Sequence, residues 1–180
     1  MSAANGHYEA WPTVIRRRNG QLCLAFSGGR RRHICPFGRL EFMQSDDHGE
    51  SWTWPRVVLD TALDDRDGGL LETQKGTLII STFTSDAYQP ILKKAEQAAA
   101  EGTLPWSAQE LCDWQQAHHR TLSSPQSQVG QWILRSTDGG ASWSHPIPSL
   151  VNSPHGPTTL RSGSLLYAGK ELWGGQGRVG

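Results

Sequence analysis

Short apolar runs separated by glycine-containing turns recur along the chain and predict β-strands joined by hairpins. Three segments, residues 12–26, 69–81 and 157–167, each read as an apolar strand, a polar turn that ends in glycine, and a second apolar strand. The first of these turns ends in Asn19-Gly20, and Asn-Gly between apolar runs is a strong hairpin signal.

The first two hairpins are each followed by a third apolar run and then by an octapeptide. The runs are residues 40–43 and 131–134, and the octapeptides are residues 45–52 and 136–143. Both octapeptides read S-x-D-x-G-x-S-W, with one of the fixed positions occupied by tryptophan. The order predicts four strands per unit, with the octapeptide as the turn between the third and fourth strands.

Each fixed residue of the octapeptide has a structural task. The Asp carboxylate and the Ser hydroxyl can accept hydrogen bonds from the N–H groups of the turn. Glycine supplies a positive φ, and the Trp ring adds buried apolar area. We therefore expect a structural role, not a catalytic one, for Ser45, Asp47, Gly49, Trp52, Ser136, Asp138, Gly140 and Trp143.

The repeated octapeptide resembles the Asp-box (BNR repeat) of the sialidase, or neuraminidase, superfamily, whose members are six-bladed β-propellers. The resemblance implies an all-β fold with blade 1 at about residues 8–60, blade 2 at about 61–150 and blade 3 at about 151–180. Two and a half blades cannot close a propeller and would leave a strand edge open. We therefore expect an incomplete propeller, with the remaining blades outside these 180 residues.

Blade 2 is longer than blade 1 because of an insertion at about residues 84–130. Residues 90–101 are rich in helix formers and end before Gly102. Residues 107–110 form a capping box, flanked by Trp106 and Leu111 as a hydrophobic staple. The insertion is thus predicted to hold two short helices, roughly 90–101 and 108–119, and to cap the site.

Composition and charge exclude several classes of protein. Lys+Arg and Asp+Glu both number 17, so the net charge favours neither nucleic acid nor a membrane surface as a partner. The three cysteines have neither the number nor the spacing of a disulfide framework or a zinc site. No apolar run has the length of a signal peptide or a membrane span, so we expect a cytoplasmic protein without metal or cofactor.

In the propeller that the resemblance implies, the Asp-box turns lie at one face, and the segments leading into the innermost strands lie at the other. Asp64-Asp65-Arg66-Asp67 precedes the first strand of blade 2, and His155 precedes that of blade 3. We predict Asp67 and His155 as catalytic groups and Arg66, Arg30 and His33 as substrate-binding groups. The alternatives are a solvated turn in which Arg66 pairs with an Asp, and a solvated run of arginines at residues 30–32.

The chain is most similar to bacterial sialidase-like BNR-repeat proteins, through Gly28-Gly29-Arg30, residues 64–69 and His155-Gly156-Pro157. It departs from true exo-sialidases at Trp11, where they carry the first of three carboxylate-binding arginines. The resemblance therefore implies a propeller acting on a carbohydrate, as a glycoside hydrolase related to exo-sialidases but not specific for sialic acid. The alternatives are a propeller that binds carbohydrate or protein without catalysis, and an inactive fragment.

Overall fold

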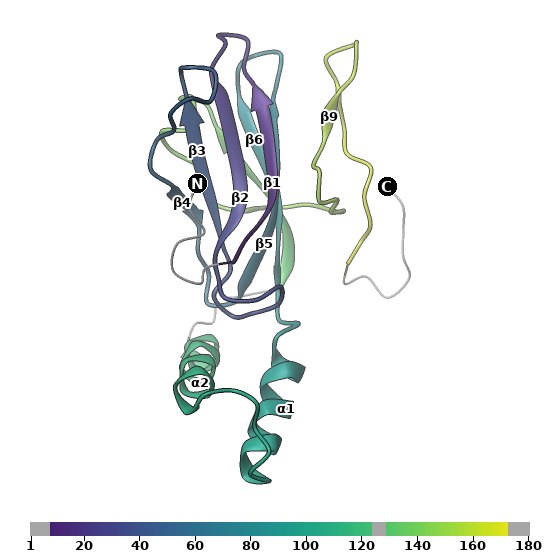
Figure 1. Ribbon diagram of the computed structural model, residues 1–180. Coiled ribbons are helices and arrows are strands. Elements are labelled where there is room, and N and C mark those ends of the chain that lie inside the picture. Colours follow the sequence, from purple (N-terminus) through teal and green to yellow (C-terminus); the bar gives the residue numbers. More distant parts are fainter. Residues whose placement is uncertain (1–7, 124–128, 173–180) are drawn as a thin grey trace.

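The computed structural model describes residues 8–123 and 129–172, and its strands form antiparallel β-sheets (Figure 1). Two four-stranded sheets have the strand orders β1-β2-β3-β4 and β5-β6-β7-β8. The first sheet consists of β1 (Tyr8–Arg16), β2 (Leu22–Arg30), β3 (Arg39–Ser45) and β4 (Arg56–Leu59). The second consists of β5 (Asp64–Glu72), β6 (Leu78–Ser85), β7 (Gly130–Ser136) and β8 (Ile147–Pro148). The predicted all-β class is confirmed, with both sheets open along their edges.

Two similar hairpins begin the two sheets. The turn between β1 and β2 ends at Gly20 with φ of 90°, and the turn between β5 and β6 ends at Gly76 with φ of 78°. In each, the glycine N–H donates to the carbonyl three residues earlier, over 2.9 Å at Gly20 and 3.0 Å at Gly76. The predicted hairpins at residues 12–26 and 69–81 are therefore present.

The two sheets pack against each other through an apolar core. Phe42 and Leu40 of β3 lie in this core with Leu78 and Ile80 of β6, and all four are fully buried. Each such side chain stabilises the fold by about 1.5–3 kcal/mol when it leaves water. The core thereby fixes how the second sheet is placed on the first.

The two octapeptide turns share one hydrogen-bonded geometry. In the first, the Ser45 hydroxyl donates to Asp47 Oδ1 over 2.8 Å, and the Ser51 N–H donates to the same oxygen over 2.9 Å. The Ser51 hydroxyl also donates to Asp47, and these bonds lower the pKa of Asp47 to about 2. Trp52 Nε1 closes the turn by donating to the carbonyl of Gly49 over 3.1 Å.

The second octapeptide repeats the serine–aspartate bonds and also contacts the first sheet, but Trp143 Nε1 is buried with no hydrogen-bond partner among the described residues. Ser136 and Ser142 both donate to Asp138, whose pKa falls well below its ordinary value, mainly because of the Ser142 hydroxyl. The Trp143 ring packs edge-on against Phe42 with 5.3 Å between centroids. The second turn is thus part of the contact between the sheets as well as a self-contained loop.

Two helices extend from the second sheet beyond one end of the β-structure (Figure 1). Helix α1 (Gln89–Ala100) carries Pro90 in its first turn, and α2 (Ala108–Ser123) begins where the Glu110 N–H donates to Ser107 Oγ over 3.1 Å. Both predicted helices are present, and α2 extends further than residue 119. Residues 124–128 of the predicted insertion lie outside the described residues.

A short hairpin of β9 (Thr158–Thr159) and β10 (Leu165–Leu166) follows the second sheet. Gly156 approaches Gly69 of β5 so closely that a Cβ on Gly69 would meet the Gly156 Cα at 2.4 Å. Residues 173–180 of the predicted third blade lie outside the described residues. Within the described part of the chain, neither helix is long and apolar enough to cross a membrane.

Gly140 and Gly20 form a matched pair for testing the contact between the second octapeptide and the first sheet. Both have φ of 90°, but a Cβ at Gly140 would meet the Phe42 ring at 2.6 Å, whereas one at Gly20 has nothing within 4 Å. Gly140→Ala should therefore lose more stability than Gly20→Ala, by about 1–3 kcal/mol for overpacking. Chemical denaturation measures both values, and equal losses would contradict the contact.

Candidate functional site

The helices extend from one end of the sheets (Figure 1). Several chemically reactive residues belong to the strand ends and the loop at that same end. They come from the starts of β1 and β5, the end of β2 and the β2–β3 loop. The octapeptide turns and the hairpin turns at Gly20 and Gly76 lie at the opposite ends of the strands. The sheets thus separate the turns from this group of side chains, which we call the Arg66 cluster: Trp11, Arg30, His33, Asp64, Arg66 and Asp67.

Arg30 and Asp64 are the two fully buried members of the cluster, and Arg30 also makes contacts beyond this pair. Its side chain has no exposed surface, and its guanidinium binds Asp64 through two bonds, of 2.6 and 3.0 Å. The same group donates to the Ser27 hydroxyl over 3.1 Å and to the His33 carbonyl over 2.7 Å. Arg30 was predicted to contact substrate, but these bonds give it a different role, because they join β2, the following loop and β5.

Asp65 is buried next to this pair without a cation of its own. The Thr61 N–H donates to its Oδ2 over 2.6 Å, and the hydroxyls of Thr61 and Thr84 donate to its Oδ1 over 3.2 and 2.6 Å. Burial outweighs these bonds and raises the pKa of Asp65 to about 7. The carboxyl is therefore half protonated near neutral pH.

Arg66 lies between two aromatic rings. Its Cζ is 4.7 Å from the centre of the Trp11 ring and 5.7 Å from that of Phe83. Its Nη1 is 3.9 Å from Asp64 Oδ2, a longer and weaker contact than the one that Arg30 makes. Its buried Nε has no hydrogen-bond partner among the described residues, so Arg66 keeps a donor for a ligand.

Asp67 combines three features that are uncommon together. Its φ of 52° lies in the left-handed region, which costs a residue other than glycine about 1–3 kcal/mol. Its Oδ1 is buried and has no hydrogen-bond partner among residues 8–123 and 129–172. Burial raises its pKa, against the positive charges of Arg66 and, more weakly, Arg30, His33 and His155. Strained and unpaired groups of this kind cluster at functional sites.

The two predicted histidines lie at the exposed margin of the cluster. The His33 ring packs edge-on against Trp11 at 5.0 Å between centroids. His155 acts on the cluster through its effect on the Asp67 carboxyl. The five predicted site residues therefore share one electrostatic environment around Asp67, two of them from the exposed side and three from the buried side.

Trp11, like Asp64, is a member of the cluster to which the sequence pattern assigned no role of its own. Its backbone has φ of 52°, and its ring also lies 5.1 Å from the Arg30 Cζ. A signal was present, because Trp11 and Asp67 each stand nine residues before the glycine of the following hairpin turn.

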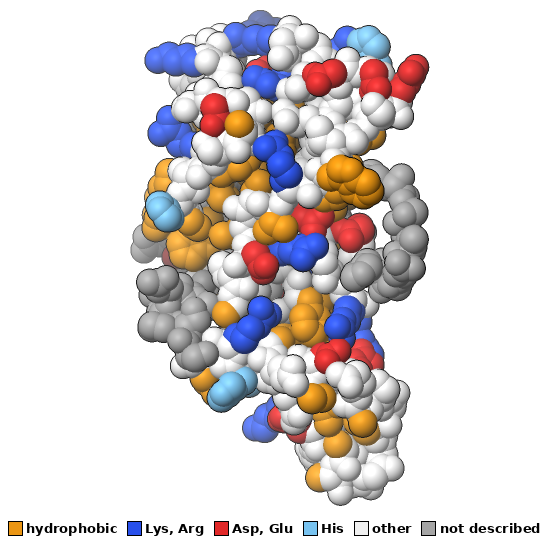
Figure 2. Space-filling view, turned by 90° about the vertical axis from the view of Figure 1, so that its left-hand side faces the viewer, with side chains coloured by type: hydrophobic (Ala, Val, Ile, Leu, Met, Phe, Trp, Pro, Cys, Tyr) orange, Lys and Arg blue, Asp and Glu red, His pale blue; other side chains and the backbone are white. Residues whose placement is uncertain are grey.

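The β2–β3 loop ties the cluster to the helices. Arg31 pairs with Asp113 over 2.5 Å and Arg32 with Glu110 over 2.6 Å, so both bind α2. Arg32 also lies over the Trp106 ring, with its Cζ 4.5 Å from the centroid. Figure 2 shows basic and acidic side chains meeting where the helices join the sheets. The run of arginines therefore includes two that hold the insertion in place.

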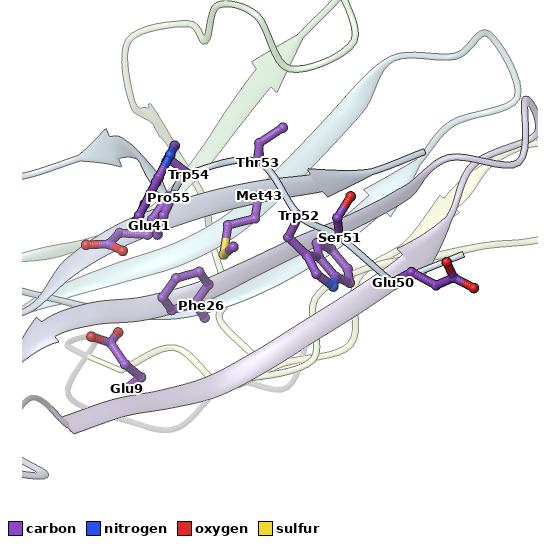
Figure 3. A pocket seen from close by; sticks show the side chains of 10 residues that line it. All are labelled: Glu9, Phe26, Glu41, Met43, Glu50, Ser51, Trp52, Thr53, Trp54 and Pro55. Carbon is purple, nitrogen blue, oxygen red and sulfur yellow. The ribbon is translucent and has the colours of Figure 1, made fainter. Parts of the chain in front are cut away.

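A separate cavity of about 400 Å³ lies on the face of the first sheet that points away from the second. Figure 3 shows the Phe26 ring between Glu9 and Glu41, with Trp54 above. None of the five predicted site residues lines it. Its walls offer no unpaired buried donor or acceptor among the described residues, so we place the candidate site at the Arg66 cluster.

The cluster has no group of ligands suited to a metal ion. Among the described residues, no three or more His, Cys, Asp or Glu side chains come close enough together to hold one.

Comparisons with known proteins give a fold and no function. No protein-family profile matches the chain, and no curated protein matches it by sequence. Among solved structures it is similar to a protein of unknown function from Dyadobacter fermentans DSM 18053, with a TM-score of 0.52 and 23% identity over 92% of this chain and 43% of that one. It also matches the Hadza microbial sialidase Hz136, with a TM-score of 0.48 and 14% identity over 82% of this chain and 26% of that one.

The first similarity shows a shared fold, and the second is too slight to support an argument. The chain spans less than half of the length of either solved structure.

Asp65 predicts a specific pH dependence of stability. Because its pKa is higher in the folded than in the unfolded protein, the folded state binds the proton more tightly, and stability falls as pH rises. The free energy of unfolding should fall by about 1.4 kcal/mol per pH unit between roughly pH 4 and the folded pKa of about 7. Above that pKa, Asp65 should cause no further change in stability.

Asp65→Asn should remove this dependence and keep the hydrogen bonds, since the amide can accept from Thr61 N–H and donate to both hydroxyls. Denaturation curves across this pH range, with the exposed Glu101→Gln as control, measure the difference. An unchanged slope in Asp65→Asn would contradict the assignment.

Proposed function

We propose that the chain forms part of a sialidase-type β-propeller and that the Arg66 cluster is its carbohydrate-binding site. In this proposal the first sheet is blade 1 at about residues 8–60, and the second is blade 2 at about 61–150. Residues 151–180 begin blade 3. The support is the shared octapeptide geometry, which matches the expected role of an Asp-box, and the face-to-face packing of two four-stranded sheets.

The observation that carries the proposal is the pair formed by Arg66 and Asp67. Each side chain is 8% exposed, and each keeps a buried polar atom unpaired among the described residues. An unpaired buried donor or acceptor costs about 1–3 kcal/mol, and a bound ligand would remove that cost at both residues. Sugar hydroxyls and carboxylates provide the acceptors and donors that this pair lacks.

Each residue of the proposed site has a distinct task. Arg66 binds a carboxylate or a pair of hydroxyls through its planar fork. Asp67, whose pKa is raised, donates a proton to the leaving oxygen of a glycoside, and His155 exchanges that proton with solvent. His33 contacts the sugar from the exposed side, and Arg30 positions Asp64 and the loop.

A carbohydrate-binding propeller without catalysis is the second candidate, and one observation favours it. Glycoside hydrolysis commonly needs two carboxyl groups flanking the bond. Of the carboxyls next to Asp67 in sequence, Asp64 is bound by Arg30, and Asp65 is held by Thr61 and Thr84. A second catalytic group would therefore have to come from outside the cluster.

Binding of sugars by the full-length protein tests the proposal. Calorimetric titration with methyl glycosides of glucose, galactose, mannose and glucuronic acid, and with N-acetylneuraminic acid, should find at least one that binds. Arg66→Ala should weaken that binding by about 1.5–3 kcal/mol, as the loss of a charged hydrogen bond predicts. Arg16→Ala, which removes an exposed arginine of β1, is the control for net charge. If no sugar binds, the proposed function is wrong.

Turnover separates the enzyme from the binding protein. Against 4-methylumbelliferyl glycosides of the same sugars, Asp67→Asn should abolish product release while binding is kept, because the amide cannot donate a proton as an acid. Activity of the parent should fall as pH rises through the pKa of Asp67. If the parent binds a sugar but hydrolyses none, the non-catalytic candidate holds.

A further inference from the structure

The first strands of the two sheets contain the same irregularity. In β1, Ala10 pairs with Ser27 and Thr13 with Ala25, so Trp11 and Pro12 together oppose one residue of β2. In β5, Arg66 pairs with Phe83 and Gly69 with Ser81, so Asp67 and Gly68 together oppose one residue of β6. Two residues opposite one is a β-bulge, a device that redirects a side chain and is frequent beside active sites.

Trp11 and Asp67 occupy equivalent positions in these two bulges. Each is the first of the two residues that oppose a single residue of the next strand, and each has φ of 52°. A left-handed backbone is an outlier for a residue as bulky as tryptophan. Since the same bulge brings Asp67 to the cluster, the repeat indicates that the bulge in β1 brings Trp11 there for the same purpose.

The indole ring of Trp11 contacts two guanidiniums of the cluster, and the residue still has exposed surface. Arg66 and Arg30 both lie near the ring, with Cζ atoms 4.7 and 5.1 Å from its centre. Both guanidiniums also contact Asp64, Arg30 through two hydrogen bonds and Arg66 at 3.9 Å. Trp11 as a whole is only partly buried, so part of its surface is open to a ligand.

We propose that Trp11 is a ligand-contacting residue that sets the specificity of the site, and that it stacks against the pyranose ring of an anionic sugar. The proposal rests on the proposed carbohydrate function and adds the substrate class. The indole takes the apolar face of the ring. Arg66 takes a carboxylate carried by the same sugar.

The charges around Trp11 decide between an anionic and a cationic ligand. An exposed aromatic ring can also attract a cation. Here two guanidiniums already lie at the ring, and their positive charge repels a second cation. Both guanidiniums keep an unpaired Nε among the described residues, but Arg30 is fully buried and bound to Asp64, so Arg66 is the one of the two with exposed surface. The ligand that fits is a ring with an apolar face and a negative charge.

Two probes separate stacking from charge recognition in the full-length protein. Methyl β-D-glucuronide and methyl β-D-glucoside share one pyranose ring and differ in whether C6 is a carboxylate or a hydroxymethyl group. The parent should bind the glucuronide more tightly. Trp11→Asn should weaken both by about tenfold or more, since both lose the same stacked contact. Arg66→Ala should weaken mainly the glucuronide.

The choice of variants guards against misfolding. Asparagine tolerates the left-handed backbone better than most residues, so Trp11→Asn relieves strain at the bulge. Trp11→Phe keeps an aromatic face and should retain most of the binding. Trp54→Asn removes a tryptophan that is 90% exposed outside the cluster, and it should bind both probes like the parent.

The outcomes separate this inference from the proposed function. If the parent binds the probes and Trp11→Asn binds them equally well, Trp11 is a structural wedge, and the carbohydrate function still stands. If the parent binds only neutral sugars, or prefers the glucoside to the glucuronide, the anionic substrate class is wrong. If the parent binds no sugar at all, the proposed function fails, and this inference fails with it.

Discussion

The buried pair of Arg30 and Asp64 is the interaction on which the rest of the site depends. It joins the end of β2 to the start of β5 and so couples the two sheets where the reactive side chains gather. Removing one partner of a buried pair leaves an uncompensated charge, which costs about 3–5 kcal/mol. The chain is shaped around the pair at Gly38, where a Cβ would meet both Arg30 Nη1 and Asp64 Oδ1 at 2.1 Å.

The pair also determines which charges stay available. Because Arg30 uses its fork on Asp64, the second guanidinium, Arg66, is held by aromatic rings and by one long contact to Asp64. Arg30 also donates to the His33 carbonyl and so fixes the β2–β3 loop. The next residues of this loop pack with apolar side chains of both helices. One buried ion pair thus organises the electrostatics of the site and its connection to the insertion.

The sequence predicted the parts of the structure that depend on residues close together in the chain. The octapeptide turns, the glycine hairpins and the start of α2 each form within about ten residues, where turn and capping chemistry decides the result. The burial of Arg30 was missed because its partner lies 34 residues away. The roles of Arg31 and Arg32 were missed for the same reason, since their partners on α2 are 82 and 78 residues distant. The bulge at Trp11 depends on how β1 pairs with β2, and its signal in the sequence is the spacing to Gly20, which Asp67 repeats to Gly76.

The octapeptide aspartates and Asp67 differ in whether their carboxyl oxygens are hydrogen-bonded. At the octapeptide end, each turn satisfies its carboxylate with several donors, so that Asp47 and Asp138 stay ionised and are held in place. At the other end, Arg66 and Asp67 carry buried atoms that the described residues leave unpaired, and Trp11 and Asp67 hold strained backbones. The octapeptide end also has a buried donor without a partner among the described residues, Trp143 Nε1, and a left-handed residue, His48. The contrast therefore lies in the carboxyl groups, and the unpaired oxygen of Asp67 is what the proposed carbohydrate ligand would satisfy.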